Sequence, residues 1–177
     1  MKIGFSKDIH ILKEGVPLIL GGVNIPYEYG LESHSDGDCL IHAIVEAIFG
    51  ALNVGDLGKH FPPNDDKYKD ISSLYFLDYT KNLLSQKSYK IGNIDCFISC
   101  EKPKLKGFLD EMKGKISKHL GINVEQISIK AGTNEGVGPV GEKKAIEAYC
   151  VVLLEEVKWW IKKLELDMLL HQPDIYI

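Results

Sequence analysis

Three side chains in this sequence are typical ligands for a divalent metal ion. Asp8 and His10 stand two positions apart in an alternating segment, and His42 lies in an otherwise apolar one. Side chains two positions apart on a strand point to the same face, so Asp8 and His10 could act together. One carboxylate and two imidazoles suit Zn²⁺ and leave a fourth position open. Because Asp-x-His is short and common, the same residues also fit a surface strand and a solvated helix.

A polar line on the predicted helix offers partners for His42. Asp38, His42 and Glu46 recur every four residues, a spacing that places side chains on one helix face. Either carboxylate could therefore orient the His42 ring from behind.

Three loops have features of phosphate or nucleotide sites. Residues 33–38, which include His34, lead into a predicted helix N-terminus, where backbone N–H groups attract anions. In the glycine-rich stretch 130–141, Thr133 offers a hydroxyl and Glu135 a carboxylate for a hard cation such as Mg²⁺. Residues 100–106 could place backbone groups and Lys104 against a base or a diphosphate. Each pattern also fits an ordinary loop, so the residues alone leave the choice open.

The hydrophobic pattern predicts the elements that must position these groups. Alternation predicts strands over residues 2–12, 89–100, 126–131 and 145–154, and a hairpin over 16–25 that turns on Gly21-Gly22. Helical periodicity predicts helices over 38–52, capped by Ser35 or Asp36, over 70–86, and from Pro103 to Gly121. Residues 30–37, 55–69 and 132–141 are predicted loops. Strands that alternate with long helices predict an α/β (α+β) sandwich, whose mixed or antiparallel sheet carries helices on one face.

The composition is that of a soluble globular domain. Of 177 residues, 45% are hydrophobic and 26% charged, which is ordinary for such proteins. The longest apolar run, residues 148–154, is too short to cross a bilayer, and the N-terminus lacks the apolar core of a secretory signal. The 4 cysteines have no Cys-x-x-Cys spacing and are predicted to be reduced core residues. We therefore expect a cytoplasmic protein with no membrane partner.

The charge of the chain restricts how it could bind phosphates. The net charge of −4 argues against a dedicated nucleic-acid binder. All 21 basic residues are lysines, so no arginine fork is available to clamp a phosphate. A phosphate site in this protein must use metal ions, backbone N–H groups and lysine.

Several segments match one known family in order and spacing. They are Asp8-Ile9-His10, Gly21-Gly22-Val23-Asn24-Ile25-Pro26, His34-Ser35-Asp36-Gly37-Asp38, His42-Ala43, Asp56-Leu57-Gly58, Phe61-Pro62, Pro103-Lys104, and Lys130-Ala131 with Thr133 and Glu135. Together they resemble the 2-C-methyl-D-erythritol 2,4-cyclodiphosphate synthase family of the non-mevalonate isoprenoid pathway. The resemblance covers residues 1–156, which we expect to be the catalytic domain. Residues 157–177 would be a C-terminal extension, a helical tail with an apolar stripe formed by Trp160, Ile161, Leu164 and Met168.

The resemblance implies an intramolecular phosphoryl transfer by a phosphorus–oxygen lyase. In 4-diphosphocytidyl-2-C-methyl-D-erythritol 2-phosphate, the 2-phosphate attacks the β-phosphorus, CMP leaves, and a cyclic diphosphate remains. Such a reaction needs positioning and charge neutralisation rather than a protein nucleophile. The resemblance also implies Zn²⁺ on Asp8, His10 and His42, and a second divalent ion, Mg²⁺ or Mn²⁺, held through Glu135.

The family's catalytic and binding residues map onto this chain position by position. His34 and Thr133 would stabilise the transition state, residues 56–58 would hold the methylerythritol part, and residues 100–106 with 131–133 the cytidine end. The family is a homotrimer with active sites between neighbouring subunits, so we expect a homotrimer here. The implied substrate contacts are Asp8, Ile9, His10, His34, Ser35, Asp56, Leu57, Gly58, Phe61, Pro62, Asp65, Cys100, Lys104, Leu105, Lys106, Ala131, Gly132, Thr133, Asn134 and Glu135.

Four positions depart from the family pattern. Before Asp8, Phe5-Ser6-Lys7 stands where the family has a glycine-rich segment with an aromatic residue. Gly132 replaces a hydroxyl residue, and Pro139 replaces an aromatic one. Glu142 replaces an arginine near the expected position of the phosphates. Lys143 or Lys144, on opposite sides of an extended segment, could supply the missing charge. Two other functions therefore stay open: a metal-dependent nucleoside-diphosphate hydrolase, and a non-catalytic trimeric homologue that binds a metal or a nucleotide.

Overall fold

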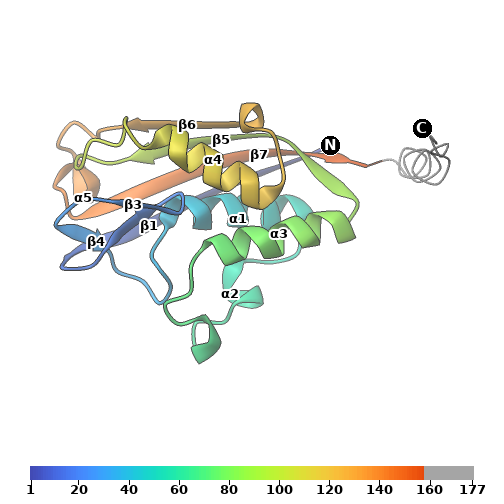
Figure 1. The fold of residues 1–177 in the computed structure, drawn as a ribbon, viewed down its shortest axis with the longest axis horizontal. Helices are drawn as coiled ribbons and strands as arrows, with labels where there is room; N and C mark the ends of the chain where they lie inside the picture. The colour runs from blue at the N-terminus through green and yellow to red at the C-terminus, as the bar shows by residue number, and fades with distance from the viewer. Residues whose placement is uncertain (158–177) are drawn as a thin grey trace, which may run out of the picture.

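A computed structural model describes residues 1–157 of the chain. Five strands form one sheet in the order β4-β1-β7-β5-β6, in which β5 and β6 run parallel and the other neighbours antiparallel. The long helices α1, α3 and α4 lie on one side of this sheet (Figure 1). The mixed sheet with helices on one side confirms the predicted fold class.

The elements have the following bounds. The sheet consists of β1 (Lys2–Glu14), β4 (Tyr29–Leu31), β5 (Tyr89–Ser99), β6 (Ile127–Gly132) and β7 (Ala145–Glu156), and β2 (Leu18–Leu20) pairs with β3 (Val23–Ile25) in a separate hairpin. The helices are α1 (Cys39–Leu52), α2 (Leu57–His60), α3 (Leu74–Gln86), α4 (Leu109–Leu120) and α5 (Gly138–Gly141), with 3₁₀ turns at Asp66–Tyr68 and Val124–Gln126.

The polar side of strand β1 carries two of the candidate metal ligands, Asp8 and His10. Gly4, Asp8 and His10 lie on the covered side against α1, whereas Phe5 and Ile11 on the other side are 64% and 65% exposed. Gly4 permits the close approach, because a Cβ there would lie 1.8 Å from the carbonyl oxygen of Ala47. The alternation of β1 predicted a strand correctly. The helices cover the side that carries the polar residues, and the apolar residues lie on the open side.

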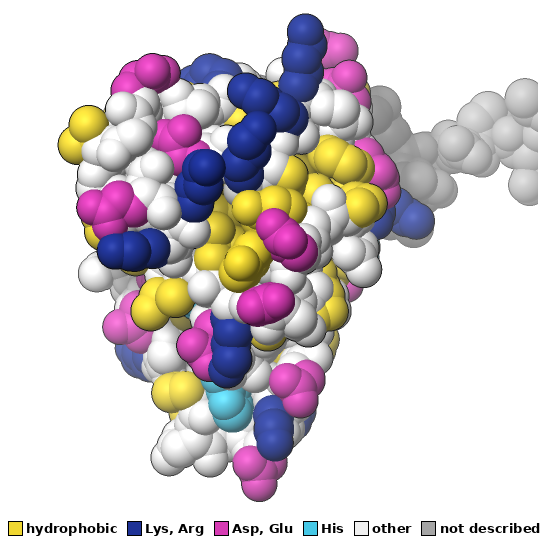
Figure 2. Space-filling view, turned by 90° about the vertical axis from the view of Figure 1, so that its left-hand side faces the viewer, with side chains coloured by type: hydrophobic (Ala, Val, Ile, Leu, Met, Phe, Trp, Pro, Cys, Tyr) yellow, Lys and Arg dark blue, Asp and Glu magenta, His cyan; other side chains and the backbone are white. Residues whose placement is uncertain are grey.

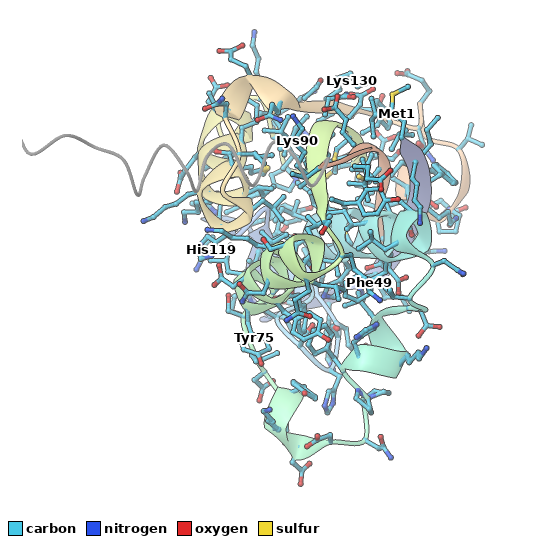
Figure 3. All side chains as sticks on the ribbon, turned by 90° about the vertical axis from the view of Figure 1, so that its right-hand side faces the viewer. Met1, Phe49, Tyr75, Lys90, His119 and Lys130 are labelled. Atoms are coloured by element: carbon cyan, nitrogen blue, oxygen red, sulfur yellow. The ribbon has the colours of Figure 1, made fainter. Side chains whose placement is uncertain are left out.

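The short helix α2 is held against α1 and α3 by an aromatic cluster. Phe49 of α1 stacks on His60 with ring centroids 4.5 Å apart. His60 also bonds the hydroxyl of Tyr79 at 2.9 Å and the carbonyl of Val54 at 3.2 Å. Figure 3 shows Phe49 on the helical side of the molecule, while Lys90, Lys130 and Met1 lie on the sheet side. These contacts fix the segment that borders one wall of the candidate site.

The N-cap of α1 is Asp38, not Ser35 or Asp36 as the sequence predicted. Asp38 Oδ1 accepts hydrogen bonds from the N–H groups of Ile41 and Gly21, both at 3.0 Å. Asp38 Oδ2 accepts from Gly22 N–H at 2.7 Å. This fully buried carboxylate ties the glycine turn of the hairpin to the first turn of α1. Local spacing could not reveal the cap, because the cap depends on a contact with the hairpin.

Other boundaries also differ from the prediction. Strand β4 occupies part of the predicted loop 30–37, because β1 continues to Glu14 and pairs with it. Helix α2 and a 3₁₀ turn lie in the predicted loop 55–69, and α5 in the predicted loop 132–141. Helix α3 begins at Leu74 rather than residue 70, since Asp70 has a left-handed backbone with φ 54°. Helix α4 begins at Leu109 rather than Pro103, and residues 103–108 form an irregular segment that ends in a turn beside a cavity.

No helix within residues 1–157 is long and apolar enough to cross a membrane. The N–H of Val157 donates to the carbonyl of Ser88 at 2.8 Å, beside the start of β5. The predicted helical tail, with the stripe of Trp160, Ile161, Leu164 and Met168, lies outside the described residues.

Candidate metal and substrate site

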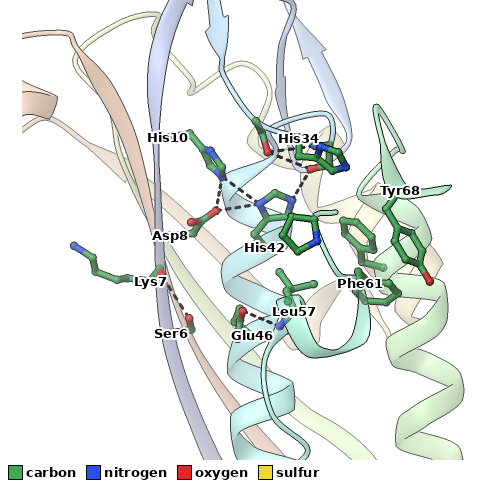
Figure 4. Close-up of a pocket in the computed structure, with 15 residues that line it drawn as sticks. Ser6, Lys7, Asp8, His10, His34, His42, Glu46, Leu57, Phe61 and Tyr68 are labelled. Atoms are coloured by element: carbon green, nitrogen blue, oxygen red, sulfur yellow. Dashed lines mark hydrogen bonds and ion pairs between the residues drawn. The ribbon is translucent and has the colours of Figure 1, made fainter. Parts of the chain in front are cut away.

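Asp8, His10 and His42 each bring one ligand atom to a common point (Figure 4). Asp8 Oδ2 lies 2.8 Å from His10 Nε2 and 3.0 Å from His42 Nδ1, and the two nitrogens are 3.3 Å apart. Strand β1 supplies Asp8 and His10 on its covered side, and the first turn of α1 supplies His42. The two parts of the predicted metal site therefore meet in the folded chain.

Hydrogen bonds at the outer ring nitrogens leave the inner nitrogens free for a ligand. A carbonyl only accepts, so His10 Nδ1 donates to Glu32 at 3.0 Å, and His10 Nε2 is the nitrogen that faces Asp8 and would bind a metal. His42 Nε2 faces the hydroxyls of Ser35, at 3.2 Å, and Ser73, at 3.1 Å. Metal-binding histidines are typically oriented in this way by a second partner.

The distances and charges of the cluster fit a small divalent cation. Ligands about 2.0–2.1 Å from a tetrahedral metal lie roughly 3.3 Å from one another, close to the 2.8–3.3 Å separations observed. Burial opposes ionisation of Asp8, but hydrogen bonds from His10 and His42 hold its pKa below the usual value. Burial also acts to lower the pKa of His10, and the Asp8 carboxylate outweighs it, so this pKa is raised. Without a metal, a proton on His10 supplies positive charge beside the ionised Asp8, and a bound cation would replace that proton.

A cavity of about 310 Å³ opens beside the cluster and holds many of the predicted substrate contacts (Figure 4). The loop before α1 contributes His34 and Ser35, and the α2 segment contributes Leu57, Gly58 and Phe61. The cavity also includes residues that were not predicted as substrate contacts, which are Ser6, Lys7, Ser33, Glu46, Pro63, Tyr68 and Phe76.

Neither carboxylate predicted to orient His42 contacts its ring. The Asp38 carboxylate accepts hydrogen bonds from the backbone N–H groups of Gly21, Gly22 and Ile41 instead. Glu46 accepts a hydrogen bond from Leu57 N–H at 2.9 Å and borders the cavity, where burial raises its pKa. The hydroxyls of Ser35 and Ser73 take the place expected for these carboxylates. The spacing along α1 was correct, but each polar side chain of this buried helix points to a different neighbour.

A second cavity, of about 230 Å³, collects the residues predicted for the cytidine end. Figure 2 views the end of the molecule where β5 and β6 finish, and shows hydrophobic and lysine side chains side by side. Apolar surface beside positive charge suits a base linked to phosphates. From the predicted ranges 100–106 and 131–133 the cavity contains Cys100, Glu101, Pro103, Lys104, Leu105, Lys106, Ala131, Gly132 and Thr133, and Leu109 adds to them.

The two predicted catalytic residues, His34 and Thr133, border different cavities. Thr133 Oγ1 donates to Glu135 Oε1 at 2.6 Å, so the predicted hydroxyl and the predicted second metal ligand are neighbours after β6. Within one chain the predicted residues therefore fall into two groups. We name them after the ligands predicted for them: the metal half-site is the cavity beside the Asp8–His10–His42 cluster, and the nucleotide half-site is the cavity that contains Thr133.

Some predicted contacts line neither cavity. The Ile9 side chain lies on the open face of the sheet and is 43% exposed, so only its backbone approaches the cluster. Asp56 caps α2 by accepting from Lys59 N–H at 2.8 Å, and Asp65 accepts from Lys67 N–H at 3.0 Å. Pro62 is half-buried in the loop after α2, and Asn134 Oδ1 accepts from the hydroxyl of Ser99.

The substituted segment around α5 is a turn, not the extended segment that the sequence suggested. Pro139 is exposed in α5, and Lys143 has a left-handed backbone with φ 62°. Lys144 Nζ pairs with Glu142 Oε2 at 2.6 Å, and both side chains are exposed. The positive charge of Lys144 is therefore already balanced by Glu142 in this arrangement.

Sequence reasoning missed Ser73, Tyr68 and Phe76. Ser73 is fully buried, and its contact with His42 spans 31 positions of the chain. No local pattern marks such a residue, because its neighbour is set by the packing of α3 on α1.

Together the fold and the site define a class: an α+β protein with an Asp-His-His cluster for a divalent metal at the base of a mixed polar and apolar cavity. The model of the YgbB family matches residues 1–155, and the chain belongs to this family.

Relatives with a known name agree with this family. The chain is 52% identical over 154 residues to a 2-C-methyl-D-erythritol 2,4-cyclodiphosphate synthase from Clostridium kluyveri, covering 87% of this chain and 94% of that protein. It is 47% identical over 158 residues to a protein of the same name from Brachyspira hyodysenteriae, covering 89% of this chain and all of the relative.

Solved structures show the same fold. A CDP complex of IspF from Plasmodium falciparum matches with a TM-score of 0.78 and 40% identity, covering 89% of this chain and 97% of that one. The bifunctional IspDF from Campylobacter jejuni matches with a TM-score of 0.86 and 34% identity over 90% of this chain. This chain spans 43% of the length of that bifunctional protein.

Proposed function

We propose that this chain is a 2-C-methyl-D-erythritol 2,4-cyclodiphosphate synthase. It would convert 4-diphosphocytidyl-2-C-methyl-D-erythritol 2-phosphate to the cyclic diphosphate and CMP, as a phosphorus–oxygen lyase of isoprenoid biosynthesis. The observation that carries the proposal is the Asp8–His10–His42 cluster in the cavity of His34 and Ser35, in a chain 52% identical to a synthase of that name.

The site suits a reaction whose substrate contains its own nucleophile. The 2-phosphate attacks the β-phosphorus and the bond to the CMP oxygen breaks, so the protein must align two phosphates and balance their charge. Zn²⁺ held by Asp8, His10 and His42 would polarise phosphate oxygens. His34 on the cavity wall, and Thr133 from the nucleotide half-site, would donate hydrogen bonds to the reacting phosphates.

A second divalent ion would accompany the diphosphate. Mg²⁺ or Mn²⁺ prefers oxygen ligands and usually binds through one or two carboxylates together with substrate phosphates. The exposed carboxylate of Glu135, beside Thr133, supports this assignment.

The working unit would be a homotrimer with active sites between subunits. The separation of His34 and Thr133 into two half-sites supports this assembly, because the metal end and the cytidine end of one substrate could be held by neighbouring copies. A second support is the open face of the sheet, where Phe5, Ile11 and Ile3 are 64%, 65% and 73% exposed. Apolar surface of this kind marks an interaction site.

We further propose that residues 1–156 form the catalytic domain, that residues 157–177 are an accessory extension, and that the protein is cytoplasmic. The family match to residues 1–155 supports the first point. Free, buried thiols at Cys39, Cys96, Cys100 and Cys150 support a reducing compartment.

A turnover assay with products separated by ³¹P NMR tests the proposal. The synthase should form the cyclic diphosphate and CMP, and His34→Ala should abolish this product without unfolding the chain. Hydrolysed, open-chain phosphates as the only products would instead indicate a nucleoside-diphosphate hydrolase. Binding of CDP and substrate without turnover would indicate the non-catalytic homologue.

A further inference from the structure

A serine outside the predicted site contacts the back of a metal ligand. Ser73 is the N-cap residue of α3, yet its hydroxyl makes no capping bond to that helix. The hydroxyl lies instead between the Asp36 carboxylate and His42 Nε2, 3.1 Å from the latter. A serine at this position ordinarily accepts from the first turn of its helix, so another use of the hydroxyl needs a reason.

The direction of each hydrogen bond follows from the chemistry of the groups. An ionised carboxylate only accepts, so Asp36 Oδ1 accepts the Ser73 hydroxyl proton, and Asp36 Oδ2 accepts Ser73 N–H at 2.8 Å. The Ser73 oxygen then presents lone pairs to His42, and His42 Nε2 must be the donor. A neutral imidazole with its proton on Nε2 has its lone pair on Nδ1, the atom 3.0 Å from Asp8 in the metal cluster.

We propose that Ser73, held by Asp36, is the positioning residue that fixes the tautomer and orientation of His42 for metal binding. This inference rests on the proposed metal site and adds Ser73, which lies outside the predicted site residues. Partners of this kind are typically worth 10–100-fold in metal affinity.

Ser35 also reaches His42 Nε2, at 3.2 Å, but its surroundings differ. Ser35 is half-buried and borders the cavity, so its hydroxyl can turn to a substrate. Ser73 is fully buried, and the Asp36 carboxylate accepts hydrogen bonds from both its N–H and its hydroxyl. Ser73 therefore supplies the permanent acceptor, whatever the cavity contains.

The first experiment measures zinc affinity by competition with a chromogenic chelator. Ser73→Ala should bind Zn²⁺ about 10–100-fold more weakly than the wild type. Ser72→Ala is the matched control, because Ser72 is the exposed neighbour in the chain, and it should retain wild-type affinity within twofold. Ser35→Ala should lose much less affinity than Ser73→Ala. Wild-type zinc affinity in Ser73→Ala would overturn the proposal.

The second experiment reads the tautomer of His42 directly in the metal-free protein, by ¹⁵N NMR of labelled histidine. In the wild type Nε2 should be protonated, because it donates to the Ser73 oxygen. In Asp36→Asn the new amide would donate to the Ser73 oxygen, so the Ser73 hydroxyl would turn toward His42 Nε2 and favour the Nδ1–H form. An unchanged Nε2–H signal in folded Asp36→Asn would overturn the proposal, even if Ser73→Ala failed to fold. If the wild type bound no zinc, the metal site would be wrong, and the tautomer would still decide the role of Ser73.

Discussion

The carboxylate of Glu46 accepts a hydrogen bond from the backbone N–H of Leu57 at 2.9 Å, and so ties α1 to the segment that leads into α2. Both residues border the metal half-site cavity. Glu46 therefore sets the position of residues 56–58, which we assign to the methylerythritol part of the substrate.

Removal of this bond should weaken substrate binding more than the chemical step. A typical hydrogen bond contributes about 0.5–1.5 kcal/mol, so Glu46→Ala should raise KM by roughly two- to tenfold with little change in zinc content. Glu46→Gln keeps an acceptor oxygen and should stay near the wild type. Steady-state kinetics on the two variants checks this, and equal KM values for both would contradict it.

Replacement of His42 should remove the metal and the activity together. His42 supplies one of three ligand atoms, and truncation leaves Asp8 and His10 with too few ligands for tight binding. We expect His42→Ala to contain no zinc after dialysis, to lack turnover, and to keep its circular dichroism spectrum. The control is His119→Ala, which removes an exposed contact to Asp78 and should retain zinc and activity. Full zinc retention in His42→Ala would rule out the metal assignment.

The buried Asp38 should be a stability residue rather than a catalytic one. Its two oxygens accept from Gly21, Gly22 and Ile41. In Asp38→Asn one oxygen becomes an NH₂ group, which cannot accept and leaves a buried N–H without a partner. We expect a loss of about 1–3 kcal/mol in the free energy of unfolding, measured by urea denaturation. A loss of activity without any loss of stability would contradict this assignment.

The open face of the sheet should show an acid-sensitive contribution to stability from Glu147. Burial opposes ionisation of Glu147, but bonds from Lys7 and Tyr149 outweigh it and lower its pKa. The unfolded chain therefore takes up a proton at higher pH than the folded one. The contribution is complete above the ordinary glutamate pKa and disappears as the pH falls through and below it. The thermal midpoint of the wild type should fall more steeply below pH 5 than that of Glu147→Gln. Parallel curves of thermal midpoint against pH for the two proteins would contradict this role of Glu147.

The same face should decide the oligomeric state. Phe5 is 64% exposed in the single chain, and a charge there would oppose burial against another copy. Phe5→Glu should convert a trimer to a monomer in analytical ultracentrifugation and reduce turnover, since the half-sites of His34 and Thr133 would separate. The control Lys118→Glu alters a charge at an exposed position of α4, and it should remain trimeric.

Local sequence patterns determined the strands, the long helices and the candidate ligands of this protein. The alternation around Asp8 and His10, the four-residue spacing around His42 and the glycine turn at Gly21-Gly22 are each encoded within one short segment. The fold class could be predicted for the same reason, because periodicity depends on neighbours in the chain. The lack of arginine in the sequence also excludes an arginine clamp.

Only the tertiary structure decided which face of β1 is covered, which residue caps α1, and which group orients His42. Periodicity fixes the relation between side chains on one element, but not which neighbouring element packs against them. Asp38 bonds to a hairpin turn 16–17 positions away, and Ser73 reaches His42 across 31 positions. The division of the predicted residues into a metal half-site and a nucleotide half-site has the same origin, since it follows from where α1, α2 and the ends of β5 and β6 lie in space.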